Sequence, residues 1–428
     1  NKFVNMTEGV KHVRSIIQCS IIPVLVILMS LFLTTCISDN KKQEQGFDDI
    51  ANKIILDWYN LYLQTERVDK NAVPPFAARN LVQISLGVYT VVEEHKHLFE
   101  TKDPQALRLL NHAFYLSMSA IYDKKTIGSA ASWLNALYQS TNRNLHTKAF
   151  YSDLYIRHIL EENERRFRED TLDTDSISYL PAYTPDPRFI YSNHIGMLPD
   201  WGNNKTILVR KSDIHLDSPY KRSLDFEKAL YDDALSVYMQ SKQLTYEDKW
   251  IGDFWSDEIR GLTFSPIGRW VSITNQTLAM EFLPALTVIR MYRDLGIALY
   301  DASVISWNIK YHYNLIRPEQ YIRTFIDSTW HAKHHPDYPS YPSAHSVFSG
   351  ASGTILEHYF KNKNRLTDDS HKQRIEFYSE KRTYKNFRSM YKECAYSRFL
   401  VGVHYLSDCE AGLNVGISVA KNVLQNVE

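Results

Sequence analysis

Glycine and proline are scarce in this chain of 428 residues, with only 15 of each. Together they make up about 7% of the sequence, against roughly 12% in average proteins. Architectures built from strands and tight turns need many of both, so the scarcity argues against an all-β fold. Cysteine is rarer still: of four, only Cys394 and Cys409 lie outside the N-terminal segment, too few for a disulfide framework.

Net charge of either sign is also missing, because 49 Lys and Arg balance 49 Asp and Glu. Non-specific binding to nucleic acid depends on an excess of basic residues, so a nucleic-acid-binding protein is not expected. Apolar residues at 44% and aromatics at 13% suffice for a buried core and exclude a wholly disordered chain. We therefore expect an all-α globular protein.

Long apolar runs are absent except near the N-terminus, where residues 16–35 follow Lys11 and Arg14 and end before Cys36. A basic start, an apolar middle and small residues at the end describe an export signal. The small residues before Cys36 resemble a bacterial lipobox, so we expect residues 1–36 to be a signal. The mature chain would then be an exported, membrane-anchored lipoprotein, periplasmic or at the cell surface. The alternative is an uncleaved transmembrane anchor, because about 20 apolar residues span a bilayer.

A polar and charged stretch, residues 37–46, fits a short tether behind the signal. Beyond it, apolar residues recur at steps of three and four, which predicts helices whose apolar stripes face a core. The clearest stripe covers residues 288–309. Other helical patterns cover about residues 107–122, 226–241 and 376–401.

Residues 173–220 carry several prolines and little periodicity, which predicts a long irregular connection. The body then has two parts. An N-terminal helical region, 47–225, includes this connection, and a C-terminal helical region, 226–428, follows it. The polar motifs that carry chemistry all fall in the second region.

The first motif consists of two cations, Lys310 and Arg317, separated by six residues and followed by Pro318. Proline stops a helix that reaches it and biases the preceding residue toward an extended conformation. Lys310 can therefore lie on a helix end while Arg317 projects from the turn. Alone, the pair also fits a basic helix terminus that the helix dipole favours.

The second motif is formed by Ser343, Ala344 and His345, before a stretch of small and apolar residues. Ser343 is a good N-cap, so the free backbone N–H groups of Ala344 and His345 would open a helix whose positive end suits an anion. His345 would stand beside whatever that end binds. The alternative is ordinary capping with a bystander histidine.

The third motif contains Arg398, His404 and Asp408. His404 and Asp408 have the same-face spacing of a helix, if a helix continues there. Asp408 would then accept the Nδ1–H of His404 and leave Nε2 aimed outward. A histidine held this way serves as a nucleophile or a metal ligand, and the alternative is a surface His–Asp pair. With three cations and several donors, the motifs together suit an oxyanion with charge on its equatorial oxygens.

The pattern Lys-x6-Arg-Pro, Pro-Ser-x-His, Ser-Arg-x5-His-x3-Asp resembles the signature of the superfamily that joins vanadium-dependent haloperoxidases with type 2 phosphatidic acid phosphatases. The flanking residues 302–313, 335–341 and 402–405 resemble the soluble bacterial haloperoxidase-like branch. The resemblance implies a helical bundle of the vanadium haloperoxidase and acid phosphatase type. It also implies vanadate as the cofactor, or no cofactor in a phosphatase.

The resemblance further implies a role for each motif residue. His404 would bond to the metal of vanadate, or attack phosphorus, and Asp408 would hold its ring. His345 would be the acid/base, at the apical oxygen or at the leaving alcohol. Ala344 stands where the family usually has glycine, and it keeps its N–H donor if it needs no positive φ. The equatorial oxygens would be bound by Lys310, Arg317, Ser343, the Ala344 amide and Arg398.

Vanadate and phosphate share geometry, so the motifs alone do not choose between two chemistries. Membrane-embedded lipid phosphatases carry the motifs among several spanning helices, whereas here the only run of spanning length is the signal. We predict a vanadate-dependent haloperoxidase that oxidises halide with hydrogen peroxide and touches the membrane only through its N-terminus. The alternatives are a soluble acid phosphatase that cleaves phosphate monoesters through a phosphohistidine at His404, and a non-catalytic oxyanion-binding protein.

Two further groups of residues are weaker candidates. The histidines 331, 334 and 335 suggest a divalent metal, but no ligand pattern supports it, and we expect them at a pocket rim. The carboxylates near Trp255 could buttress Arg398, yet a solvated acidic face is the simpler expectation. These carboxylates are Asp253, Asp257 and Glu258.

Overall fold

A computed structural model describes residues 46–427 apart from 70–72, 123, 142–152, 168–195, 222, 224, 258, 260, 362 and 373. The predicted signal and nearly all of the predicted tether lie outside these residues. Within the described part of the chain, no helix is both long enough and apolar enough to cross a membrane.

Helices dominate the described residues, which confirms the predicted all-α class. The N-terminal part contains α2 (Phe47–Val68), α3 (Pro74–Glu94), α4 (Lys96–Glu100), α5 (Pro104–Ile121), α6 (Lys124–Thr141) and α7 (Asp153–Arg165). Two short 3-10 helices, η2 (Pro199–Asn203) and η3 (Lys211–Asp213), precede α8 (Phe226–Lys242), α9 (Tyr246–Phe254) and α10 (Pro266–Leu278). The remainder contains α11 (Ala285–Tyr313), α12 (Pro318–Phe325), α13 (Ala344–Tyr359), β1 (Leu366–Asp368), η4 (Ile375–Phe377), β2 (Arg382–Tyr384), α14 (Phe387–Leu400) and α15 (Leu406–Asn426).

Most of the predicted helices are present, and one boundary is wrong. The predictions for 107–122, 226–241 and 288–309 are confirmed by α5, α8 and α11. The helix predicted from residue 376 begins only at Phe387, because Asn386 caps it: the Asn386 side chain accepts the N–H of Ser389 at 2.8 Å. The residues before the cap include β2, which pairs antiparallel with β1.

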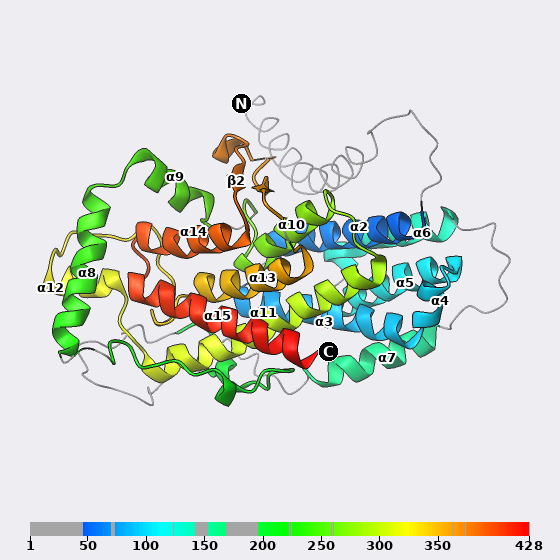
Figure 1. Cartoon of the computed structure of the whole chain (residues 1–428), viewed down its shortest axis with the longest axis horizontal. Helices are drawn as coiled ribbons and strands as arrows, with labels where there is room; N and C mark the ends of the chain where they lie inside the picture. Colours follow the sequence, from blue (N-terminus) through cyan, green and yellow to red (C-terminus); the bar gives the residue numbers. More distant parts are fainter. Residues whose placement is uncertain are drawn as a thin grey trace, which may run out of the picture. The chain divides into compact units, whose positions relative to one another are not determined.

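The core of the C-terminal region is α13, which packs against α11, α14 and α15 (Figure 1). Helices α13 and α15 approach closely because α15 carries glycine where they meet. A Cβ at Gly412 would lie 2.5 Å from the Ser343 carbonyl oxygen, and one at Gly416 would lie 2.0 Å from that of Val347. The two helices therefore run in the same direction, and the start of α13 meets the start of α15.

Helix α11 is buried along most of its length, beyond the one apolar stripe that was predicted, and its buried residues include the charged Asp294, Asp301 and Lys310. It packs against α13, which belongs to the C-terminal region, and against α3, which belongs to the N-terminal region. The described part of the predicted irregular connection, residues 196–220, contains only η2 and η3 and lies partly on α11. Asp301 of α11 fixes it by accepting three consecutive backbone N–H groups at 2.6–3.0 Å, those of Ile207, Leu208 and Val209.

Candidate active site

The three predicted motifs meet at the helix ends around the start of α13. Lys310 belongs to the last turn of α11, Arg317 precedes α12 in an extended conformation, and Ser343 precedes α13. All the predicted site residues are at least nine-tenths buried. They are Lys310, Arg317, Ser343, Ala344, His345, Arg398, His404 and Asp408.

His404 is oriented by Asp408, as its spacing suggested. The distance from His404 Nδ1 to Asp408 Oδ2 is 3.1 Å, and Ser340 Oγ and the backbone N–H of Tyr405 also donate to that oxygen. The assumption of a continuous helix was wrong, because α14 ends at Leu400 and α15 begins only at Leu406. The contact forms instead because His404 lies just outside the first turn of α15, within reach of Asp408.

The tautomer of His404 follows from this contact. When the Asp408 carboxylate is ionised it only accepts hydrogen bonds, so Nδ1 then carries the proton and Nε2 keeps its lone pair. Burial raises the pKa of Asp408, while the hydrogen bond from Ser340 and the charge of Lys310 oppose that rise. Arg317 Nη1 lies 3.5 Å from Nε2. His404 can therefore bond through Nε2 to an electrophilic centre.

Lys310 and Arg317 hold the segment that leads into α13. Lys310 Nζ donates to the carbonyl oxygens of Pro339 at 2.9 Å and Ser340 at 3.1 Å, and also to that of Pro342. Arg317 Nε donates to the Tyr338 carbonyl at 2.6 Å. Burial, followed by the charge of Arg317, lowers the pKa of Lys310. The two cations thus fix the backbone on which the second motif stands and bring positive charge to it.

Ser343 occupies the predicted N-cap position, but its side chain makes no capping hydrogen bond. Its hydroxyl oxygen is buried and has no hydrogen-bond partner among the described residues, and the same holds for His345 Nε2. Ala344 is the first residue of α13 and is not among the residues with positive φ, so it keeps an N–H donor that lacks an intrahelical acceptor. Buried polar groups of this kind need a partner, and an oxyanion fits all three.

Arg398 completes the set from α14. Its Nε donates to Ser397 Oγ at 3.0 Å and its Nη2 donates to the Trp255 carbonyl at 2.6 Å. Arg398 lines a cavity of about 490 Å³ together with His345 and His404. The cavity thus brings Arg398 and the two histidines into one space, and Arg317 lies beside it, in contact with His404.

The carboxylates near Trp255 were expected to lie on a solvated acidic face. This expectation was wrong for Asp257 and correct for Asp253. Asp257 is 7% exposed, and Oδ2 lies 3.8 Å from His345 Nε2. Asp253 is exposed and forms an ion pair with Lys333, and Glu258 lies outside the described residues. The apolar residues Phe254 and Trp255, both fully buried, were the local signal that the chain turns inward here.

Two of the three neighbouring histidines lie at the rim, as expected, whereas His331 is exposed and does not line the cavity. His334 and His335 line the cavity, and His331 and His335 each bind one carboxylate oxygen of Glu319, at 2.8 and 2.6 Å. Within the described ranges, no group of His, Cys, Asp or Glu forms a site for a metal cation. These histidines are therefore not assigned to a divalent metal.

Replacing Asp408 by Asn tests how far the orientation of His404 matters. We expect Asp408→Asn to lower kcat or the affinity for the oxyanion by about 10–100-fold, the usual cost of losing the partner that orients a histidine ligand. Steady-state kinetics and equilibrium binding of orthovanadate measure the two quantities separately. Asp233→Asn is a suitable control, because Asp233 binds Ser407 on the same helix without contacting His404. Equal losses in both variants would contradict the assigned orientation.

Comparison with known proteins supports the same reading of the fold. The model of the VCPO second helical-bundle domain matches residues 290–428. A structure of the first bacterial vanadium-dependent iodoperoxidase is 20% identical; the match spans 91% of this chain and 99% of that one, with a TM-score of 0.73. The match is thus nearly end to end.

Two structures of a bacterial vanadium-dependent chloroperoxidase also match. The holo-type structure is 13% identical, with a TM-score of 0.58, over 90% of this chain and 97% of that one. The apo-type structure is 12% identical, with a TM-score of 0.60, over 92% of this chain and 98% of that one. No curated protein sequence matches the chain significantly. At these identities the structures establish the fold, and the chemistry has to be argued from the residues.

Proposed function

We propose that this protein is a vanadate-dependent haloperoxidase. Residues 290–428 match the model of the VCPO second helical-bundle domain, and the chain has the fold of vanadium-dependent haloperoxidases, in agreement with the resemblance seen in the sequence. It oxidises halide with hydrogen peroxide. The reaction converts halide, peroxide and one proton into hypohalous acid and water.

One observation carries this proposal: the Nε2 of an oriented histidine lies among buried cations, close to buried polar atoms that lack hydrogen-bond partners among the described residues. His404 is held by Asp408, and Ser343 Oγ has no hydrogen-bond partner among the described residues. Burial, followed by the charges of Arg317, Lys310 and Arg398, lowers the pKa of His404, so three buried cations act on this histidine and a multiply charged oxyanion is the ligand that compensates them. A neutral ligand would leave that charge in place.

The residues present fit vanadate, which would bond to His404 Nε2. Its equatorial oxygens would be held by Arg317, Arg398, Ser343 and the Ala344 amide, and Lys310, whose three N–H donors go to carbonyl oxygens in this structure, would contribute its charge. Bound vanadate supplies a metal oxyanion that activates hydrogen peroxide toward attack by halide. Asp408 fixes the His404 ring, so the bond-forming nitrogen points into the cavity without further reorganisation.

His345 is the residue that moves protons. Its Nε2 lies near Asp257 and on the same cavity as His404, and it has no hydrogen-bond partner within the described structure. Burial, followed by the charges of Arg398 and of nearby basic groups, lowers its pKa well below the usual value. The ring is therefore neutral near pH 7 and can accept a proton from peroxide and later return one.

The proposal is tested on purified protein lacking residues 1–36, loaded with orthovanadate and desalted. Oxidation of iodide and bromide by hydrogen peroxide is measured beside hydrolysis of an aryl phosphate by vanadate-free protein. We expect halide oxidation that depends on vanadate and negligible hydrolysis. Rapid hydrolysis inhibited by vanadate would instead assign the acid phosphatase alternative to the same residues. Binding of vanadate without either activity would leave the non-catalytic binding protein.

We also propose that the chain is exported and anchored by a lipid on Cys36. The order of basic, apolar and small residues before Cys36 supports this location. In a bacterial host that processes lipoproteins, the wild type should fractionate with membranes and Cys36→Ala should not be lipidated. Mass spectrometry of the N-terminal peptide checks the processing, and an intact, unmodified N-terminus on the wild type would reject it.

A further inference from the structure

Two buried carboxyl groups that the oxyanion-binding set does not use, Glu66 and Asp257, line the same cavity as His345. Glu66 lies in the last turn of α2 and is 2% exposed. Its Oε1 accepts the backbone N–H of Ser265 at 3.1 Å, whereas Oε2 is buried without a hydrogen-bond partner in the described part of the chain. A buried oxygen without a partner calls for an explanation.

The first turn of α10 holds the Glu66 carboxyl in place. Ser265 is the N-cap of α10 and its hydroxyl accepts the N–H of Gly268 at 3.1 Å. A Cβ at Gly268 would lie 2.4 Å from Glu66 Oε2. Only glycine therefore leaves room for the carboxyl at this helix end, where the helix dipole also favours a carboxylate.

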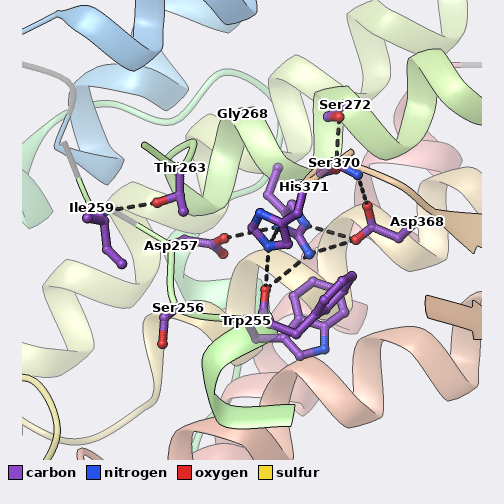
Figure 2. Close-up of polar contacts among 12 residues, drawn as sticks. Trp255, Ser256, Asp257, Ile259, Thr263, Gly268, Ser272, Asp368, Ser370 and His371 are labelled. Carbon is purple, nitrogen blue, oxygen red and sulfur yellow. Dashed lines mark hydrogen bonds and ion pairs between the residues drawn. The ribbon is translucent and has the colours of Figure 1, made fainter. Parts of the chain in front are cut away.

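The same turn of α10 also contacts Asp257, through the side chain of Arg269. Arg269 Nη1 lies 3.8 Å from Asp257 Oδ1, and its Nε donates to Asp368 Oδ2 at 2.9 Å. Figure 2 shows Asp257 on one side of this cluster, Asp368 on the other and the His371 ring between them. His371 Nε2 lies 2.7 Å from Arg269 Nη1. Asp257 is therefore a fixed carboxyl between a rigid cation and His345 Nε2, which lies 3.8 Å from Oδ2.

Both carboxyls exchange protons near neutral pH. Burial raises the pKa of Glu66 to about 7, with Asp257 and Asp69 adding to the rise and Ser265 opposing it. Burial likewise raises the pKa of Asp257 to about 7, against the charges of Arg269 and Arg398 and with that of Asp368. Other titratable groups near them are Tyr62, Tyr122, His334 and His345. Below pH 7 the pair is protonated, and above it the pair loses its protons.

On the basis of the proposed haloperoxidase function, we propose that Glu66 and Asp257 form a proton relay that returns protons to His345. Each turnover consumes one proton, because halide loses two electrons to peroxide and the products are hypohalous acid and water. Asp257 passes a proton to His345 Nε2, regains one from Glu66 through water in the cavity, and Glu66 regains one from solvent. A cavity of about 490 Å³ is large enough for several water molecules.

The first test uses vanadate-free protein, so it does not depend on activity. The infrared C=O stretch of protonated carboxyl groups is followed from pH 5 to pH 9 in the wild type, Glu66→Gln and Asp257→Asn. Each substitution keeps the shape of its side chain and should remove one band that titrates near pH 7. Asp253→Asn, which changes an exposed carboxylate four residues before Asp257, should leave both bands.

The second test is the pH profile of halide oxidation by vanadate-loaded protein. We expect kcat of Glu66→Gln to match the wild type near pH 5.5 and to fall about tenfold by pH 8, as protons in solvent become scarce. Gly268→Ala keeps Glu66 but displaces its carboxyl, so it should show the same pH-dependent loss. This variant guards against a folding defect caused by the buried amide of Glu66→Gln.

The outcomes separate the relay from the proposed function. Halide oxidation by the wild type with an unchanged profile in both Glu66→Gln and Gly268→Ala would overturn the relay alone. Carboxyl bands that neither substitution at 66 nor at 257 removes would also overturn it. A vanadate-loaded wild type that oxidises no halide would overturn the proposed function and, with it, the use of the relay.

Discussion

His404→Ala is expected to abolish halide oxidation, lowering kcat roughly a thousandfold or more. The remaining cations and donors attract an oxyanion but form no bond to its central atom, because His404 supplies the one imidazole nitrogen that Asp408 aims into the cavity. Vanadate affinity should fall with activity. The fold should survive, with a loss in the free energy of unfolding of about 1–3 kcal/mol for a buried ring.

The experiment compares His404→Ala with the wild type by circular dichroism, chemical denaturation, equilibrium binding of orthovanadate and halide oxidation. His335→Ala is the matched control, since His335 lies exposed at the rim of the same cavity and binds Glu319. The control should keep vanadate affinity and most of the activity. Full activity in a folded His404→Ala protein would contradict the assignment of the whole site.

Much of the site was predictable because each motif lies at a helix end, where sequence spacing and backbone geometry are closely linked. Pro318 starts α12 and leaves Arg317 extended, as expected. The N-cap position of Ser343 was also predicted correctly, although its hydroxyl makes no capping hydrogen bond. The contact between His404 and Asp408 was predicted correctly from their spacing. The reason given for it was wrong, because no continuous helix contains both residues.

The groups behind the site were not predictable, because they are joined only by the tertiary fold. Glu66 meets Ser265 across 199 residues, and Arg269 meets Asp368 across 99. No local periodicity links such pairs, and a charged residue in a sequence is ordinarily expected at the surface. Asp257 was misread for this reason, since its burial depends on Arg269 and on the cavity.

The residues proposed to bind the oxyanion and those proposed to supply protons lie in different parts of the chain. All the residues assigned to the oxyanion lie in the segment 290–428 that the family model matches. Glu66, Asp257 and Arg269 lie before it, although Arg269 is anchored by Asp368 within it. In the proposed mechanism the matched segment would bind the oxyanion, whereas proton supply would depend on how the earlier helices pack against it.

His345→Ala should separate binding from turnover. His345 makes none of the predicted contacts to equatorial oxygens, so vanadate affinity should stay within about tenfold of the wild type. We expect kcat to fall by roughly 10²–10⁴, the usual contribution of general acid/base catalysis. We expect that the neighbouring Asp257 does not replace the lost imidazole, because its carboxyl is held beside Arg269, with Oδ1 3.8 Å from Nη1.

The comparison of His345→Ala with His404→Ala is more informative than either variant alone. A bound but inactive His345→Ala protein and an unbound, inactive His404→Ala protein would assign proton movement to one histidine and bonding to the other. Calorimetric titration with orthovanadate gives the affinity, and initial rates at saturating peroxide and halide give kcat. Loss of vanadate binding in both variants would mean that His345 is part of the binding set, and the relay from Glu66 and Asp257 would then lead to a ligand contact instead of an acid/base.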